Sequence, residues 1–293
     1  MMQDSHPMAG RVCVITGATS GLGQVTARRL AELGAEVVVV GRDAAKCAAT
    51  AERITRETGN AAVSWLRADL SSQREVAELA RQLQQRGGPI HVLLNNAGVI
   101  VPKRQLSVDG IELTLATNYL GPFLLTNLLL DELKASAPAR VVNVCSVSHA
   151  NAEIDFADLG LEQRYRGFKA YGRSKLALLL FTYELARRLE GTGVTVNAAN
   201  PGLVWTKLGQ HSLSGRISQR LVHLRYRKDS VSPEEGARSL IYLASSAEVE
   251  GVSGTYVTGE EAGPSSPRSY DRALAERLWQ ESLELTKPRP APA

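Results

Sequence analysis

The chain has 293 residues, 44% of them hydrophobic and 22% charged, which is an ordinary composition for a globular protein with a sizeable core. Its net charge is only +4, and it has no basic tract with interleaved aromatic residues, which argues against nucleic acid as a partner. The most apolar run, residues 123–130, is interrupted by Thr126 and Asn127 and is too short for a membrane span.

Two further features predict a cytoplasmic location. The cysteines Cys13, Cys47 and Cys145 are odd in number and widely spaced, so they predict neither a disulfide nor a metal site and favour a reducing compartment. Residues 1–9 lack the apolar core of a signal peptide, and we expect them to form a flexible N-terminus.

The first half of the chain alternates predicted strands and helices. In chain order they lie at residues 12–16, 22–33, 37–40, 43–58, 62–67, 72–86 and 90–95. Continuous β-branched runs such as 37–40 are typical of strands buried on both faces, as in parallel sheets. This repeated pattern with short connections predicts a single-domain, Rossmann-type α/β fold, in which helices cover both faces of a doubly wound parallel sheet.

The second half continues the alternation around one irregular insert. We expect a helix at 110–134, a strand at 140–145, the insert at 149–168, a helix that begins at Tyr171 and a strand at 194–199. Beyond Pro233 we expect a helix to residue 244, a strand at 254–257 and an amphipathic helix at 270–285. The domain then spans 10–262 with a lid at 203–230, followed by a helical extension at 263–286 and a disordered, proline-rich tail at 287–293.

The segment TGATSGLG, residues 16–23, lies between the first strand and the first helix. Its glycines permit a tight turn and let a pyrophosphate approach the backbone at a helix N-terminus, where the amide groups and the helix dipole favour anions. A glycine turn without a ligand is the alternative. The predicted cofactor contacts here are Gly17, Ser20, Gly21, Leu22 and Gly23.

The residues that leave the second strand predict which dinucleotide is bound. An acid at this point binds the ribose 2′-hydroxyl, and counting alone would select Asp43. Arg42 precedes it, however, and an arginine favours a 2′-phosphate through charge-assisted hydrogen bonds, whereas Asp43 is well placed to cap the next helix. We therefore predict NADP(H) rather than NAD(H).

The segment YGRSK places Tyr171 and Lys175 four residues apart, on one face of a helix. A free phenol has a pKa of about 10, and an ammonium group beside it would lower that pKa, so that Tyr171 could exchange a proton with a substrate oxygen. Taken alone, such a pair is also a common surface arrangement.

Together these motifs resemble the short-chain dehydrogenase/reductase family over residues 12–259, and most closely its retinol-dehydrogenase-like branch. VGRD at 40–43, the long insert before YGRSK and LALLLFTYELARRL at 176–189 carry the resemblance to that branch. One departure is Asn200, which stands where the branch commonly has a histidine before Pro-Gly.

The resemblance implies roles for further residues. It places Asn118 as a catalytic asparagine that holds a water beside Lys175, and Ser146 as the serine that binds the substrate carbonyl, with Ser148 as its rival. Lys175 would also bind the nicotinamide ribose. The further cofactor contacts that it implies are Asp69, Leu70, Asn96, Ala97, Gly98, Pro201, Gly202, Val204 and Thr206.

The lid at 203–230 has apolar residues at helical spacing, with Trp205 and Leu208 adding bulk. A bulky apolar substrate that contacts Trp205 and Leu208 is one interpretation, and an amphipathic helix packed on the domain is the other. Basic residues also gather at 216–228, as a solvated face or as a handle for an anionic substrate, a carrier protein or a membrane surface.

Two predicted helices, 111–133 and 176–189, are apolar nearly all round, so one face of each should meet something other than the sheet. The family builds a four-helix interface there, which predicts a homodimer or homotetramer; the insert at 149–168 could cover the surface instead. The predicted function is an NADP(H)-dependent enzyme that interconverts a carbonyl compound and an alcohol, without a metal. A redox-neutral epimerase or dehydratase and an NADP(H)-sensing binding module are the alternatives.

Overall fold

The first apolar run forms an interior strand of the sheet, β1 (Val12–Thr16), in which every residue is buried. The structure is a computed structural model that describes residues 6–204 and 231–287. Strand order in the sheet of the described residues is β3-β2-β1-β4-β5-β6-β7-β8, and every pairing is parallel except that of β8 with β7. The other strands are β2 (Glu36–Gly41), β3 (Val63–Arg67), β4 (Val92–Asn95), β5 (Ala139–Val144), β6 (Val194–Asn200), β7 (Tyr256–Thr258) and β8 (Glu261–Gly263).

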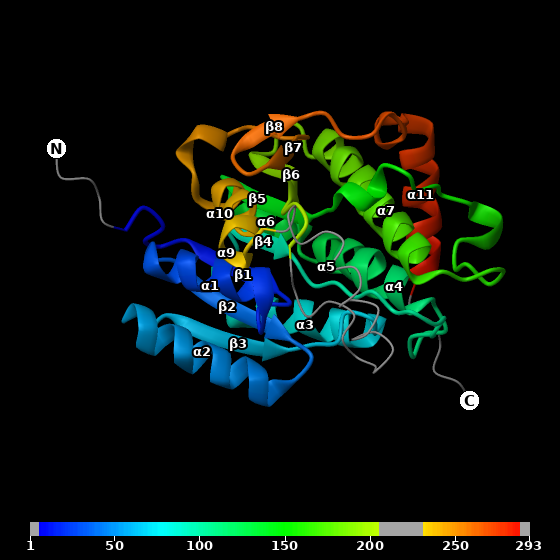
Figure 1. Ribbon diagram of the computed structural model, residues 1–293. Coiled ribbons are helices and arrows are strands. Elements are labelled where there is room, and N and C mark those ends of the chain that lie inside the picture. Colours follow the sequence, from blue (N-terminus) through cyan, green and yellow to red (C-terminus); the bar gives the residue numbers. More distant parts are fainter. Residues whose placement is uncertain (1–5, 205–230, 288–293) are drawn as a thin grey trace.

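Helices cover both faces of this sheet (Figure 1). Alternate residues of a strand face opposite layers, so that Cys13 and Ile15 pack in one apolar cluster and Val12 and Val14 in another. The first cluster includes residues of α1 (Gly21–Glu32), α2 (Ala44–Thr58) and α10 (Arg238–Ser245). The second includes residues of α3 (Gln73–Arg86), α5 (Gly121–Leu128), α7 (Gly167–Arg188) and α11 (Arg272–Leu285). The doubly wound fold predicted from the sequence is confirmed.

Local capping explains why two helices begin where they do. The Asp43 carboxylate accepts a hydrogen bond from the Lys46 amide at 3.1 Å, as expected of a residue that caps α2. Ser72 caps α3 in the same way through the Glu75 amide. The short elements of the described chain are α4 (Leu113–Leu115), η1 (Ala116–Leu120), α6 (Leu130–Ala135), η2 (Val147–His149), η3 (Phe156–Asp158), α9 (Pro233–Gly236), η4 (Ala247–Val249) and η5 (Pro267–Tyr270).

Three predicted elements need correction. The continuous helix expected at 110–134 is divided into α4, η1, α5 and α6, and η1 is a π-helix turn. The helix expected to begin at Tyr171 begins at Gly167, because Arg166 is the last extended residue of the insert, so Tyr171 lies in its second turn. β8 was not expected, since a strand of three exposed residues has no apolar alternation to reveal it.

The outer face of α5 and α7 is covered by α11 (Figure 1). The Trp279 ring lies 5.2 Å from the ring of Phe123 and 5.7 Å from that of Phe181, between ring centroids. The Tyr119 hydroxyl is also 2.6 Å from that of Ser282. The insert contributes at one end, where the Arg277 guanidinium stacks 3.9 Å from the ring of Phe156. The contacts of α11 thus occupy part of the face that the family's four-helix interface would use.

Within residues 6–204 and 231–287, no helix combines the length and apolarity that crossing a membrane requires. The same residues contain no cluster of three or more potential metal ligands among His, Cys, Asp and Glu. The three cysteines are free and buried.

Candidate active site

A cavity of about 510 Å³ lies at the carboxyl ends of the parallel strands, where doubly wound sheets bind their ligands. Of the predicted site residues in the described chain, most line this cavity. These are Gly17, Ser20, Gly21, Leu22, Arg42, Leu70, Asn96, Ala97, Gly98, Ser146, Tyr171, Lys175, Pro201, Gly202 and Val204. The predicted contacts Trp205, Thr206 and Leu208 lie outside the described residues, as does the lid from 205 to 230.

The glycine turn is shaped so that side chains would not fit within it. Gly17 has a φ of +66°, and a Cβ there would stand 2.7 Å from the Ala97 Cα. A Cβ on Gly23 would collide with the side-chain nitrogen of Asn96, Nδ2. This nitrogen donates to Thr16 O at 2.8 Å and to Gly17 O at 3.2 Å. Gly23 therefore does not line the cavity but lets Asn96 hold the turn closed.

The N-terminus of α1 borders the cavity, and no carboxylate of its first turn faces the free amide groups there. Ser20 makes no side-chain capping bond, and the first turn of α1 contains no acid. The first amide groups of a helix need acceptors, and together with the helix dipole they favour a phosphate. The bare backbone of the glycine turn and this free helix end fit the pyrophosphate of a dinucleotide.

Two cations stand at the far end of the same cavity. Arg42 and Lys46 both line it and are exposed, whereas the Asp43 carboxylate is turned to the α2 amide and to Lys46 Nζ, 3.5 Å away. The sequence interpretation missed Lys46, although a lysine four residues after Arg42, in the first turn of a helix, is a visible signal. Asp69 does not line the cavity. Its carboxylate accepts hydrogen bonds from the amide and hydroxyl of Ser71, at 2.9 and 2.7 Å.

Ser146 follows the end of β5 and is the first residue of a tight turn. Its hydroxyl accepts a hydrogen bond from the Ser148 amide at 3.3 Å and lies 3.3 Å from the Ser148 hydroxyl. Ser146 lines the cavity and Ser148 does not, which favours Ser146 of the two predicted serines. The helix α7 approaches this turn closely, since a Cβ on Gly172 would stand 2.8 Å from Ser148 O.

Tyr171 and Lys175 enter the cavity from α7, and the Lys175 ammonium lies 5.6 Å from the centre of the Tyr171 ring. Burial raises the pKa of Tyr171 to about 12, although a hydrogen bond with Ser146 opposes the rise. Burial also lowers the pKa of Lys175 to about 8. The net shift of the Tyr171 pKa is therefore upward, opposite to the expectation from the sequence, because the loss of solvent around the phenol is its largest cause.

Asn118 lies in the π-helix turn, and its amide is fully engaged. Its Oδ1 accepts from the Val99 amide at 2.7 Å, and its Nδ2 donates to Val99 O and to the Ser174 hydroxyl, both at 3.0 Å. It does not line the cavity itself. A Cβ on Gly98 would stand 3.5 Å from Asn118 Oδ1 and 3.8 Å from Lys175 Nζ, so both side chains lie near Gly98.

Asn200, the departure from the branch, supports the Pro-Gly turn. Its Oδ1 accepts from the Gly202 amide at 3.2 Å, and its Nδ2 donates to the Thr258 hydroxyl at 3.0 Å. Gly202 has a φ of +72°, which favours glycine. Asn200 thus links the turn that carries Pro201 and Gly202 to the neighbouring strand β7.

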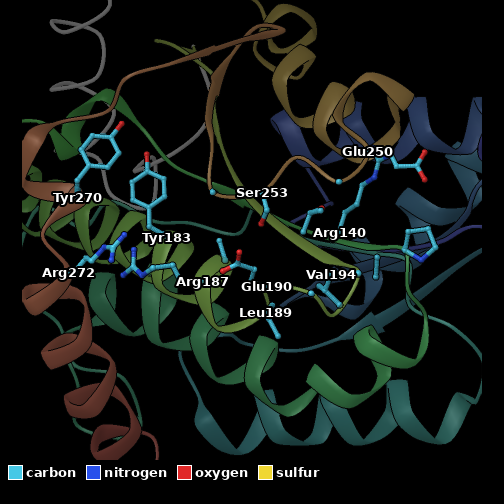
Figure 2. Close-up of a pocket in the computed structure, with 18 residues that line it drawn as sticks. Arg140, Tyr183, Arg187, Leu189, Glu190, Val194, Glu250, Ser253, Tyr270 and Arg272 are labelled. Carbon is cyan, nitrogen blue, oxygen red and sulfur yellow. The ribbon is translucent and has the colours of Figure 1, made fainter.

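A second cavity, of about 750 Å³, includes Ala139 and Val194, the first residues of β5 and β6 (Figure 2). It shares no residue with the first and contains none of the predicted site residues. Arg140 in its wall donates to Leu243 O and Ser246 O, which fixes its guanidinium as part of the fold. Most of the predicted catalytic and cofactor-binding residues that the structure describes therefore line the first cavity, and none of them lines this one.

Comparisons with known proteins agree with this arrangement. Residues 11–216 match the short chain dehydrogenase family. Retinol dehydrogenase 13 of Mus musculus is 42% identical over 283 residues, which cover 94% of this chain and 84% of that protein. Polyprenol dehydrogenase of Homo sapiens is 40% identical over 287 residues, which cover 96% and 86% of the two chains.

Two solved structures share the fold. An uncharacterized protein from Mycobacterium paratuberculosis matches with a TM-score of 0.78 and 36% identity, over 98% of this chain and 97% of that chain. The Pseudomonas aeruginosa RhlG/NADP active-site complex matches with a TM-score of 0.70 and 30% identity, over 88% and 97%. The chain therefore belongs to the short-chain dehydrogenase family, whose members are oxidoreductases that use a nicotinamide cofactor, and to its retinol-dehydrogenase-like branch.

Proposed function

We propose that this protein is an NADP(H)-dependent oxidoreductase that interconverts a ketone or aldehyde and an alcohol on a bulky, largely apolar substrate, with Tyr171 as the acid and base. The observation that carries the proposal is the shared cavity: Ser146, Tyr171 and Lys175 line the same space as the glycine turn. A proton donor and a carbonyl-binding hydroxyl thus lie next to a dinucleotide cradle.

The cofactor preference follows from charge. Gly17, Gly21 and the free end of α1 would hold the pyrophosphate, and Arg42 and Lys46 would hold a 2′-phosphate. Among the described residues, two cations and no acid line this end of the cavity. The 2′-hydroxyl of NAD(H) would therefore lack its usual carboxylate partner. The Pseudomonas aeruginosa RhlG/NADP complex, a structural neighbour of this chain, supports the same choice.

The bound cofactor supplies or accepts the hydride. The Ser146 hydroxyl donates a hydrogen bond to the substrate oxygen and orients it. Tyr171, which is protonated at neutral pH, transfers its phenolic proton to that oxygen in reduction. Lys175, which lies with Asn118 near Gly98, would supply the proton that replaces the one lost from Tyr171.

The substrate class rests on the relatives and on the lid. Two relatives are named for retinol and polyprenol, which are long apolar alcohols. The lid sequence carries matching apolar residues, among them Trp205 and Leu208. The proposal keeps the cytoplasmic location that the three unpaired cysteines favour.

The test compares Tyr171→Phe with the wild-type protein. The variant should bind NADPH normally, as followed by its fluorescence, but reduce a bulky apolar aldehyde about 10³-fold more slowly, because general acid catalysis is lost. Tyr242→Phe removes a hydroxyl on α10 that donates to Glu248, and this matched control should keep full activity. Near-normal turnover by Tyr171→Phe would refute the proposal.

The same assay separates the alternatives. An oxidoreductase consumes NADPH in proportion to the aldehyde that it reduces, whereas an epimerase or dehydratase converts its substrate with no net loss of NADPH absorbance. A binding module would show neither change.

A further inference from the structure

The buried side chain of His149 connects two segments that are far apart in the sequence. Its Nδ1 lies 2.6 Å from Ser146 O, and its Nε2 accepts a hydrogen bond from the Ser266 amide at 3.1 Å. An amide N–H can only donate, so Nε2 carries no proton and Nδ1 must be the nitrogen that donates to Ser146 O. His149 is only 3% exposed, and burial lowers its pKa, which keeps this neutral form in place.

On one side, His149 closes the turn that presents the Ser146 hydroxyl. Ser146 O accepts both the His149 backbone amide, at 3.2 Å, and the His149 side chain, while the Ser146 hydroxyl accepts from the Ser148 amide. The first and last residues of the turn are thus joined by two bonds. The direction of the hydroxyl depends on this turn, since Ser146 has no other side-chain restraint within the described protein than its contacts with Ser148 and Tyr171.

On the other side, His149 is held by the C-terminal extension. Ser266 immediately precedes η5, and Ser266 O accepts from the amide and hydroxyl of Ser269. The Arg268 guanidinium donates to Ala152 O at 2.8 Å and pairs with Glu153 at 3.1 Å. The Tyr256 ring packs edge-on against the imidazole, with 5.3 Å between ring centroids. The His149 imidazole, which accepts from the Ser266 amide, is therefore held in place by contacts with several residues.

We propose that His149 is a positioning residue for Ser146: its Nδ1–H donates to Ser146 O, closes the serine turn and so aims the Ser146 hydroxyl into the active-site cavity. This inference rests on the proposed function, because it assigns to Ser146 the carbonyl-binding role. The bond from the Ser266 amide has the lesser part, because it fixes the tautomer in which Nδ1 carries the proton.

Two amide substitutions separate the two bonds of the imidazole. In His149→Asn the side-chain amide stands near the position of Nδ1 and still donates to Ser146 O, but it no longer reaches Ser266. In His149→Gln the side chain reaches the position of Nε2 and still accepts from the Ser266 amide, but the bond to Ser146 O is lost. We expect kcat of His149→Asn to stay within about threefold of wild type, and kcat of His149→Gln to fall about tenfold or more, with KM for NADPH unchanged in both.

A double-mutant cycle with Ser146→Ala tests whether His149 acts through the serine. In the Ser146→Ala background, His149→Gln should lower turnover by less than about twofold, because no hydroxyl remains to be aimed. His91→Gln is the matched control for a lost histidine bond, since His91 Nδ1 accepts from the Val12 amide at 3.0 Å at the start of β4, far along the sheet from Ser146. It should keep wild-type kcat.

Equal losses of kcat in the Asn and Gln variants, or a full tenfold loss on the Ser146→Ala background, would show that His149 is only structural and would overturn the proposal. Failure of the proposed function looks different, because Tyr171→Phe would then remain active. If Tyr171→Phe is inactive and His149→Gln turns over normally, the reductase proposal stands and the role of His149 is refuted.

Discussion

The ammonium group of Lys175 donates a hydrogen bond to the carbonyl oxygen of Val144 at 2.6 Å. Val144 is the last residue of β5, two positions before Ser146, so the helix that carries Tyr171 is bonded to the end of the strand that carries the serine. Lys175 is 3% exposed, and burial lowers its pKa from 10.5 to about 8. The bond and the burial together make Lys175 a titratable part of the core.

This predicts a pH-dependent stability. Between pH 8 and 10.5 the unfolded chain holds the Lys175 proton more tightly than the folded protein, so stability rises with pH in that window. The free energy of unfolding of wild type relative to Lys175→Met should therefore increase by about 1.4 kcal/mol per pH unit there. Urea unfolding of both proteins across the window measures it. Tyr171 has the opposite effect, because its raised pKa costs stability above pH 10, but that effect is common to both proteins and cancels.

A stability difference that does not change with pH would mean that Lys175 keeps one charge state throughout. Lys103→Met, at an exposed position, is the control for the loss of a lysine.

Arg42 and Lys46, the two cations at one end of the active-site cavity, predict that removing either charge weakens the preference for NADPH. Arg42→Ala should raise KM for NADPH by about tenfold and leave KM for NADH almost unchanged, since a charge-assisted bond to the 2′-phosphate is lost. Lys46→Ala should act in the same direction. Arg56→Ala, in the last turn of the same helix and exposed, is the matched control and should change neither value. Equal increases in both KM values would show that Arg42 does not read the 2′-phosphate.

The close packing at Gly172 predicts that a larger residue there lowers kcat without weakening the binding of the cofactor. In Gly172→Ala the new Cβ would stand 2.8 Å from Ser148 O, so helix α7 and the serine turn must move apart. Misplacing Tyr171 relative to Ser146 by about 1 Å should lower kcat by roughly 10- to 100-fold. NADPH binding should change little. Gly263→Ala, where a Cβ meets nothing within 4 Å, is the control; wild-type kcat in Gly172→Ala would show that the contact relaxes at no cost to the site.

The features that could be predicted from the sequence are those with a local signal. The buried strand β1, the glycine turn and the pair Tyr171 and Lys175 are each recognisable within a few residues. Asp43 was rightly expected to cap α2 for the same reason.

The features that could not be predicted depend on contacts across the fold. The π-helix turn at Asn118 is an extra residue in a helical turn, and helical periodicity gives no sign of it. The pKa of Tyr171 depends on how much solvent its neighbours exclude, which only the packed structure reveals. The bond from Ser266 to His149 spans 117 positions, and neither residue belonged to a motif.

The packing of α11 against α5 and α7 is another contact of this kind. It predicts that residues of α11 contribute strongly to the free energy of unfolding. An amphipathic helix near the C-terminus was expected, but its apolar side had no assigned partner. Trp279 is 7% exposed, contacts Phe123 and Phe181, and is covered by the Arg188 guanidinium 4.2 Å from its ring. Trp279→Ala should therefore lower the free energy of unfolding by about 3–5 kcal/mol, the usual cost of emptying a buried aromatic site.

Urea unfolding followed by circular dichroism measures this loss. Trp65→Ala is the matched control, because Trp65 is 40% exposed on β3, and its removal should cost about 1 kcal/mol or less. The partial release of α11 should also uncover apolar surface on α5 and α7, so light scattering of Trp279→Ala should show larger particles than wild type at the same micromolar concentration. If both tryptophan variants lose the same stability and neither associates, α11 does not cover this face in solution, and the face is open to a second subunit.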